Sequence, residues 1–199
     1  MKIAVFASGR GTNLAAIIRA KQKGNLNAEI GLVISDNKKA LALKKAQRAG
    51  IKAVFIDPQR FSNKSDFENE IIKAVEAEGI DLIILAGFMR ILSPEFVSRF
   101  KNKILNIHPA LLPSFKGAHA IKDAFDFGIK VTGVTVHFVD EEMDHGPIIL
   151  QKAIAIEEND TLETLESKIH KVEHKIYPEA IKLFIEGKLK IEGRKVQIV

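Results

Sequence analysis

The most informative segment of this sequence reads Ile104-Leu105-Asn106-Ile107-His108-Pro109-Ala110-Leu111-Leu112-Pro113-Ser114-Phe115-Lys116-Gly117. Two apolar residues lead into Asn106 and His108, and Pro109 then ends the strand pattern. Side chains two positions apart in a strand point to the same face, so this amide and imidazole are expected side by side. Such a pair suits a reaction in which a carbonyl oxygen becomes negative while a proton moves. The alternative is a histidine satisfied at a strand end beside an asparagine in a turn, and this segment alone does not separate the two.

The composition describes a globular chain of one domain. Of its 199 residues, 46% are hydrophobic and 28% are charged, which provides a sizeable core. The absence of cysteine excludes disulfides, thiolate nucleophiles and cysteine-ligated metals. No segment reads as a signal peptide or a membrane span, so we expect a cytoplasmic protein. The net charge of +5 favours anionic partners, but the lysines are spread along the chain, and we expect neither nucleic-acid nor membrane binding.

The N-terminus has the layout of an anion site. Residues 3–7 form a strand pattern, Ser8-Gly9-Arg10-Gly11-Thr12-Asn13 follows at once, and Leu14, Ile17 and Ile18 then recur at helical spacing. A glycine loop between a strand and a helix start aims backbone N–H groups at an anion. The loop is neither a nucleotide P-loop nor a dinucleotide fingerprint, because it lacks the Lys-Ser/Thr pair and the third glycine. The alternative is a glycine turn that only makes a tight connection.

Strand and helix patterns alternate along the rest of the chain. Strands are expected at residues 28–35, 53–56, 81–86, 131–139 and 148–156, and helices at residues 38–49, 65–78, 118–127 and 161–184. A short helix is expected to begin at Ser93-Pro94-Glu95, and the tail from Gly187 reads as short strand or coil. This alternation predicts an α/β fold with an open, mostly parallel, doubly wound (Rossmann-like) sheet and helices on both faces.

Three further segments have two interpretations each. The first segment follows a strand and reads Gly87-Phe88-Met89-Arg90-Ile91-Leu92. It either lines a pocket for a flat heterocycle or simply belongs to the core. The second segment is acidic and reads Asp140-Glu141-Glu142-Met143-Asp144-His145-Gly146-Pro147. It either places a carboxylate near His108, which would orient the ring and favour its charged form, or it is an ordinary polar turn. His170-Lys171-Val172-Glu173-His174 matches a zinc-peptidase spelling, but so short a match arises easily by chance. We interpret His137, alone on its strand, as structural.

Taken together, four motifs resemble phosphoribosylglycinamide formyltransferases. They are Ser8-Gly9-Arg10-Gly11-Thr12-Asn13-Leu14, Ala86-Gly87-Phe88-Met89-Arg90-Ile91-Leu92-Ser93-Pro94, Asn106-Ile107-His108-Pro109-Ala110-Leu111-Leu112-Pro113 and Asp144-His145-Gly146-Pro147-Ile148-Ile149. The resemblance covers essentially the whole chain. It implies the formyltransferase fold and transfer of a formyl group from the co-substrate 10-formyltetrahydrofolate to the amine of glycinamide ribonucleotide, in de novo purine synthesis and without a metal.

The resemblance also implies the site residues. Asn106, His108 and Asp144 would be catalytic. Ribonucleotide binding would fall to Gly11, Thr12, Asn13, His170 and Glu173, and folate binding to Lys64, Met89, Arg90, Ile91, Leu92, Asp140 and Asp144. The N-terminal half of residues 1–199 would then hold the ribonucleotide phosphate, and the C-terminal half the folate and the chemistry. Lys64 departs from the arginine common in relatives, and His170 departs from a lysine.

Rival functions stay open from the sequence. Formyltetrahydrofolate hydrolase and methionyl-tRNA formyltransferase share the Asn-x-His-Pro core, but each usually has an additional domain for which we expect no room in 199 residues. A non-catalytic phosphate-binding module is the rival from another class. The expected partners are small-molecule substrates, and the expected state is a monomer or homodimer.

Overall fold

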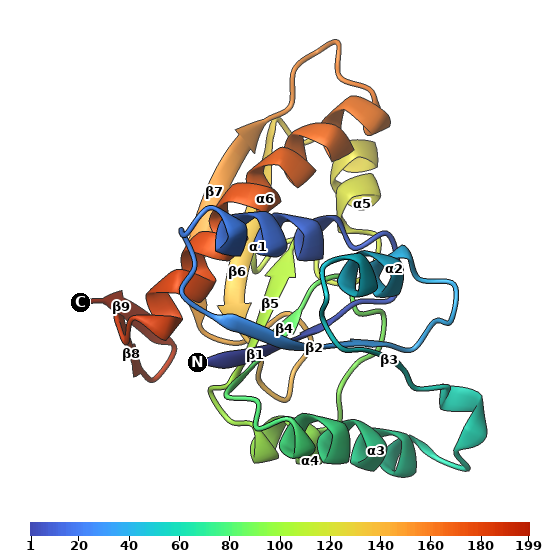
Figure 1. Cartoon of the computed structure of the whole chain (residues 1–199). Coiled ribbons are helices and arrows are strands. Elements are labelled where there is room, and N and C mark those ends of the chain that lie inside the picture. Colours follow the sequence, from blue (N-terminus) through green and yellow to red (C-terminus); the bar gives the residue numbers. More distant parts are fainter.

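The computed structural model describes residues 1–199 and contains one sheet of nine strands, in the order β3-β2-β1-β4-β5-β6-β7-β9-β8 (Figure 1). The strands are β1 Lys2–Phe6, β2 Glu29–Ser35, β3 Ala53–Phe55, β4 Leu82–Leu85, β5 Ile104–His108, β6 Val131–Phe138, β7 Ile148–Ala155, β8 Leu189–Glu192 and β9 Lys195–Ile198. The helices are α1 Thr12–Gln22, α2 Leu41–Arg48, α3 Lys64–Ala77, α4 Pro94–Arg99, α5 Ala120–Phe127 and α6 Leu162–Ile185, with a 3-10 turn η1 at Pro58–Arg60.

The first five strands form the parallel, doubly wound part of the sheet. β1 pairs with β2 and β4, β2 with β3, and β4 with β5, all in parallel. Helices α1, α2, α5 and α6 cover one face, and α3 and α4 cover the other (Figure 1). Both faces bury apolar side chains, in one cluster of 29 residues and another of 14, so β4 is apolar throughout and β1 is apolar after Lys2. The predicted α/β fold class is confirmed.

The last strands run against this pattern. β6 pairs antiparallel with β5, and its register sets Asn106 opposite His137 and His108 opposite Thr135. β7 pairs antiparallel with β6. The C-terminal tail forms the β8–β9 hairpin, which joins the sheet through one residue pair, Ile148 with Lys195. The sheet is therefore entirely parallel up to β5 and mixed beyond it.

Helix α6 is fixed beneath the centre of the sheet by a buried tyrosine. The Tyr177 side chain is fully buried, and its hydroxyl lies 2.7 Å from the Leu85 carbonyl oxygen and 3.0 Å from that of Leu105. Burial raises the pKa of this phenol well above its usual value, so it remains a hydrogen-bond donor. Glu173 lies four residues earlier on the same helix face, which directs it to the edge where β4 and β5 end.

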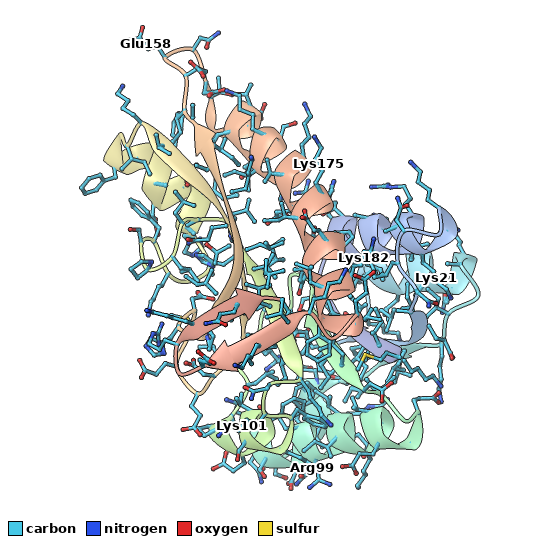
Figure 2. All side chains as sticks on the ribbon, turned by 90° about the vertical axis from the view of Figure 1, so that its left-hand side faces the viewer. Lys21, Arg99, Lys101, Glu158, Lys175 and Lys182 are labelled. Atoms are coloured by element: carbon cyan, nitrogen blue, oxygen red, sulfur yellow. The ribbon has the colours of Figure 1, made fainter.

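Element boundaries differ slightly from the sequence expectations. Helix α2 begins at Leu41 rather than at residue 38, because the Asn37 side chain accepts the Lys39 N–H and holds a turn there. Helix α1 begins at Thr12, directly after the left-handed Gly11. None of the helices is both long and apolar enough to cross a bilayer. Basic side chains are spread over several elements, with Lys175 and Lys182 on α6 and Lys101 after α4 (Figure 2).

Candidate active site

The carboxyl ends of β1, β4 and β5 border a deep cavity. Its volume is about 530 Å³. The cavity is lined by residues 9–13, 85–92, 106–109, 117–118 and 139–144, together with His137, His170 and Glu173. This edge is where open α/β sheets bind their ligands. The glycine loop lies at one part of the lining and the segment 87–92 at another, so one cavity serves both predicted ligand sites.

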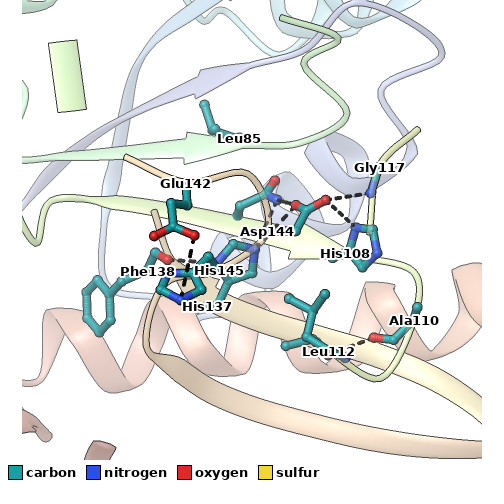
Figure 3. Close-up of polar contacts among 12 residues, drawn as sticks. Leu85, His108, Ala110, Leu112, Gly117, His137, Phe138, Glu142, Asp144 and His145 are labelled. Atoms are coloured by element: carbon teal, nitrogen blue, oxygen red, sulfur yellow. Dashed lines mark hydrogen bonds and ion pairs between the residues drawn. The ribbon is translucent and has the colours of Figure 1, made fainter. Parts of the chain in front are cut away.

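Asp144 holds the centre of the predicted catalytic group (Figure 3). One carboxylate oxygen, Oδ2, accepts the Gly117 N–H at 2.9 Å and lies 3.4 Å from His108 Nδ1. The other oxygen, Oδ1, lies 3.4 Å from Asn106 Nδ2. The opposite ring nitrogen of His108, Nε2, lies 2.7 Å from the Phe115 carbonyl oxygen. The structure therefore brings Asn106, His108 and Asp144 together from β5 and the loop before β7.

The loops that complete this group have unusual backbone conformations. Phe115 and Asp144 both have positive φ angles, 51° and 49°, in the region that side chains other than glycine rarely adopt. Such strain persists only where surrounding contacts impose it, and it concentrates at functional sites. The carboxylate of Asp144 is 11% exposed and His108 is 4% exposed, so both groups interact across little water.

His137 contacts the catalytic group, although the sequence suggested only a structural role. Its Nδ1 lies 2.7 Å from the Phe138 carbonyl oxygen and donates to it, so Nε2 is the acceptor for Asn106 Nδ2 at 3.2 Å. Burial lowers the pKa of His137, which keeps this ring neutral. The neutral ring orients the Asn106 amide toward the Asp144 carboxylate. Only the β5–β6 register shows this pairing, and no local sequence signal could have revealed it.

The glycine loop is packed tightly against helix α2. A side chain at Gly11, whose φ is 64°, would lie 2.8 Å from the Cα and Cβ atoms of Ala42. The ammonium of Lys45 lies 2.7 Å from the Arg10 carbonyl oxygen and 3.3 Å from that of Gly11. With these carbonyls bound by Lys45, the first N–H groups of the 11-residue helix α1 are presented at the cavity.

Four side chains meet beside this loop. Glu173 is 4% exposed, and its Oε2 lies 3.0 Å from both Asn13 Nδ2 and His170 Nδ1. The hydrogen bond that His170 donates to Glu173 raises the pKa of His170. The Asn13 Oδ1 atom is buried without a partner, so a ligand donor would satisfy it. The other ring nitrogen of His170 faces Arg10 at 3.3 Å, and His170, Glu173 and His174 form no metal-binding group.

Segment 87–92 forms an apolar wall of the cavity. Met89 is 72% exposed and Ile91 is 63% exposed, so interpretation of the whole segment as core is wrong for these two residues. Leu92 is buried and belongs to the core while also lining the cavity. Arg90 donates from Nε to Asp36 at 2.8 Å, and its guanidinium lies 5.3 Å from the Phe67 ring centroid. Two large exposed apolar side chains on a fixed backbone suit a flat ligand.

The remaining predicted folate residues differ in their placement. Lys64 does not line the cavity, and its ammonium lies 3.8 Å from Glu68 at the start of α3. Asp140 lines the cavity, and its Oδ2 lies 2.7 Å from Nδ1 of His145. Arg194 of the C-terminal hairpin donates to the His145 carbonyl oxygen at 2.6 Å, a contact absent from the sequence analysis. Residues from both halves of the chain line the cavity, and the suggested division of the two ligands between the halves stays a prediction.

Comparisons with known proteins identify the family of this chain. A family model described as Formyl transferase matches residues 1–181. A phosphoribosylglycinamide formyltransferase of Bacillus subtilis is 46% identical over 91% of this chain and 93% of its own length. The trifunctional purine biosynthetic protein adenosine-3 of Gallus gallus is 46% identical over 96% of this chain, which spans only 19% of that relative. Glycinamide ribonucleotide transformylase 1 of Symbiobacterium toebii has a TM-score of 0.98, covering 100% of this chain and 94% of that structure at 46% identity.

Proposed function

This chain belongs to the phosphoribosylglycinamide formyltransferases of the formyl transferase family, and on that premise we propose how its own residues transfer the formyl group. The proposed reaction moves a formyl group from 10-formyltetrahydrofolate to the amine of 5-phosphoribosylglycinamide. The observation that carries the proposal is the convergence of Asn106, His108 and Asp144 at the wall of one cavity. The proposed setting is the cytoplasm, with the chain as a monomer or homodimer.

The chemistry begins with attack of the substrate amine on the formyl carbon, which forms a tetrahedral intermediate with a negative oxygen. Asn106 Nδ2 can donate a hydrogen bond to that oxygen, and a protonated His108 can donate another from Nε2 once this nitrogen leaves the Phe115 carbonyl oxygen. Such donors act most strongly where charge develops. The two N–H bonds of this amide face His137 Nε2 at 3.2 Å and Asp144 Oδ1 at 3.4 Å. The contact to His137 keeps the amide oriented, while the N–H that faces Asp144 turns to the negative oxygen as the charge forms.

A proton must pass from the attacking amine to the folate nitrogen that leaves. His108 is the group in the cavity wall that suits this transfer, directly or through a water molecule. Asp144 stabilises the imidazolium that forms, since its carboxylate lies 3.4 Å from His108 Nδ1. No covalent intermediate on the protein is required, so no nucleophilic side chain is assigned.

The two substrates are proposed to occupy different parts of the cavity. The backbone of Gly11, Thr12 and Asn13 would bind the ribonucleotide phosphate at the start of α1, while Glu173 and Asn13 would bind its hydroxyl or amine groups. The folate ring would lie on the exposed side chains of Met89 and Ile91, with the loop 140–144 on its other side. The reacting carbon would then lie between the two, beside His108.

Hydrogen bonds that fix the backbone of the proposed folate-binding segment are a second argument for a bound flat ring. The Met89 N–H donates to the Ser8 hydroxyl at 2.9 Å, and the Ser8 hydroxyl donates to Asp36, which also accepts Arg90. This chain of hydrogen bonds fixes the backbone under the exposed side chains. Lys64 is the predicted folate residue with the weakest support, because it lies outside the cavity lining.

An absorbance assay tests the proposed reaction. Deformylation of a 10-formyl folate analogue is followed with purified protein, with and without glycinamide ribonucleotide. We expect loss of the formyl group only when the ribonucleotide is present, with formylated ribonucleotide as the product. Equal rates without the ribonucleotide would instead assign the chain as a formyltetrahydrofolate hydrolase. No reaction in either case, with ribonucleotide binding retained, would assign a phosphate-binding module.

A further inference from the structure

Arg10 makes a contact that the proposed mechanism does not use. It lies between the two glycines of the loop after β1, and its Nη2 atom is 3.3 Å from His170 Nε2 on helix α6. The other ring nitrogen, Nδ1, lies 3.0 Å from Oε2 of Glu173. Arg10, His170 and Glu173 all line the cavity. The exposed guanidinium of Arg10 therefore contacts the neutral ring of His170, within reach of the first turn of α1.

The geometry assigns the protons. A guanidinium only donates hydrogen bonds, so His170 Nε2 accepts from Arg10 and the ring proton is on Nδ1, which donates to Glu173. His170 is therefore neutral while Arg10 occupies this position. A proton on Nε2 would place two positive groups 3.3 Å apart. Protonation of His170 and the contact with Arg10 exclude each other.

A contact with Lys45 fixes the backbone of Arg10 in the glycine loop. Its carbonyl oxygen accepts from Lys45 Nζ at 2.7 Å, which fixes the peptide that precedes Gly11. The guanidinium is long enough to reach an anion bound at the N–H groups that follow, and it forms shorter and stronger hydrogen bonds to an anion than to a neutral imidazole. A phosphate dianion would therefore compete effectively with His170 for Arg10.

We propose that Arg10 is a phosphate-binding and specificity-determining residue that leaves His170 for the ribonucleotide phosphate, while His170 takes up a proton as Arg10 departs. This inference rests on the proposed function, since it requires a phosphorylated substrate at the glycine loop. It makes ribonucleotide binding both selective for the phosphate and linked to proton uptake.

The charges around His170 support the uptake of that proton. Glu173 raises the pKa of His170 most, and Glu166 on the same helix adds to this effect, whereas burial and the charge of Arg10 lower the pKa. The His174 ring is stacked nearly parallel to the His170 ring, with 6.4 Å between the two ring centroids. When Arg10 moves to the phosphate, its opposing charge is offset by the anion, and only burial still opposes the effect of the two glutamates. The pKa of His170 is then higher in the complex than in the free protein, so binding takes up protons near and above neutral pH.

Calorimetric titration with the ribonucleotide and with the corresponding unphosphorylated riboside tests the inference. Arg10→Ala should weaken ribonucleotide binding about 10- to 100-fold and leave riboside binding unchanged, because only the phosphate contact is lost. Arg10→Lys keeps the charge but not the planar fork, so its affinity should fall between these values. Arg19→Ala is the matched control, since Arg19 is an exposed arginine of α1 outside the cavity lining.

Proton uptake is measured in the same titrations, in buffers of different ionisation enthalpy between about pH 7 and about pH 9. The wild-type protein should take up a fraction of a proton per ribonucleotide, and His170→Asn should abolish this uptake. Wild-type affinity in Arg10→Ala, or equal losses for ribonucleotide and riboside, would overturn the inference and leave the proposed function intact. Absence of any ribonucleotide binding by the wild-type protein would overturn both.

Discussion

Replacement of Asp144 by asparagine tests the arrangement of the catalytic group most specifically. The substitution keeps the shape of the side chain and removes its charge. Oδ2 accepts from Gly117 N–H, and Oδ1 lies nearest to Asn106 Nδ2, so both oxygens face donors. An amide has only one oxygen. Whichever way the asparagine is turned, its NH₂ group therefore faces a donor, and one buried contact becomes repulsive.

The expected magnitude follows from these contacts. Leaving a buried polar group without its partner costs about 1–3 kcal/mol, and loss of the contact to His108 adds about 1 kcal/mol. A combined loss of about 2–4 kcal/mol in the transition state corresponds to a roughly 30- to 1000-fold lower kcat. The KM for the ribonucleotide should change little, because Asp144 lies 3.4 Å from His108 and not beside the glycine loop.

Steady-state kinetics of Asp144→Asn measure both parameters. Asp123→Asn is the matched control, because Asp123 is an exposed carboxylate in the first turn of α5, outside the cavity lining, and its loss should leave kcat unchanged. A kcat within about threefold of wild type in Asp144→Asn would refute the reasoning, since it would show that neither the charge nor its two donors matter.

Three other substitutions probe the scaffold. Tyr177→Phe removes a fully buried hydroxyl with two carbonyl partners, and it should cost about 1–3 kcal/mol and lower Tm by roughly 2–12 °C in thermal unfolding. Gly146→Ala would bring Cβ to 1.9 Å from the Phe138 carbonyl oxygen, so the loop must move; kcat and Tm should both fall. Asp160 has a pKa of about 2, held below 3.8 chiefly by Lys168, so its stabilisation is present above pH 3.8 and lost as pH falls toward 2. The stability lost in Asp160→Asn, measured by denaturant unfolding, should therefore shrink over that range.

Each of these three has a clear contrary outcome. An unchanged Tm in Tyr177→Phe would mean that the Leu85 and Leu105 carbonyls do not need this donor. Full activity in Gly146→Ala would show that the loop tolerates displacement without loss of catalysis. A stability difference for Asp160→Asn that persists at the acid end would mean that the contacts of its ionised carboxylate are not the source of the stabilisation.

The sequence predicted the parallel part of the fold well because its signals are local. The apolar runs of β1 and β4 and the glycine loop before α1 each read correctly from a few adjacent residues. The C-terminal hairpin could not be specified in this way. The hairpin joins the sheet through a single residue pair, Ile148 with Lys195, so no extended sequence pattern indicates that it pairs there.

The site was predicted as residue types and only partly as geometry. Asn106 and His108 share a strand face, so their proximity follows from period two. The role of His137 depends on its antiparallel register with Asn106, which joins residues 31 positions apart. The contact of Arg10 with His170 spans 160 positions. Such pairings are decided by packing of whole elements, and single-sequence patterns do not encode them.

The rate of formyl transfer by His108→Ala tests the central claim most directly. His108 is proposed to bind the negative oxygen and to carry the proton, while the ribonucleotide phosphate binds elsewhere in the cavity. We predict that this variant transfers the formyl group about 100- to 1000-fold more slowly and binds the ribonucleotide with unchanged affinity. Transfer at the wild-type rate by His108→Ala would contradict the account.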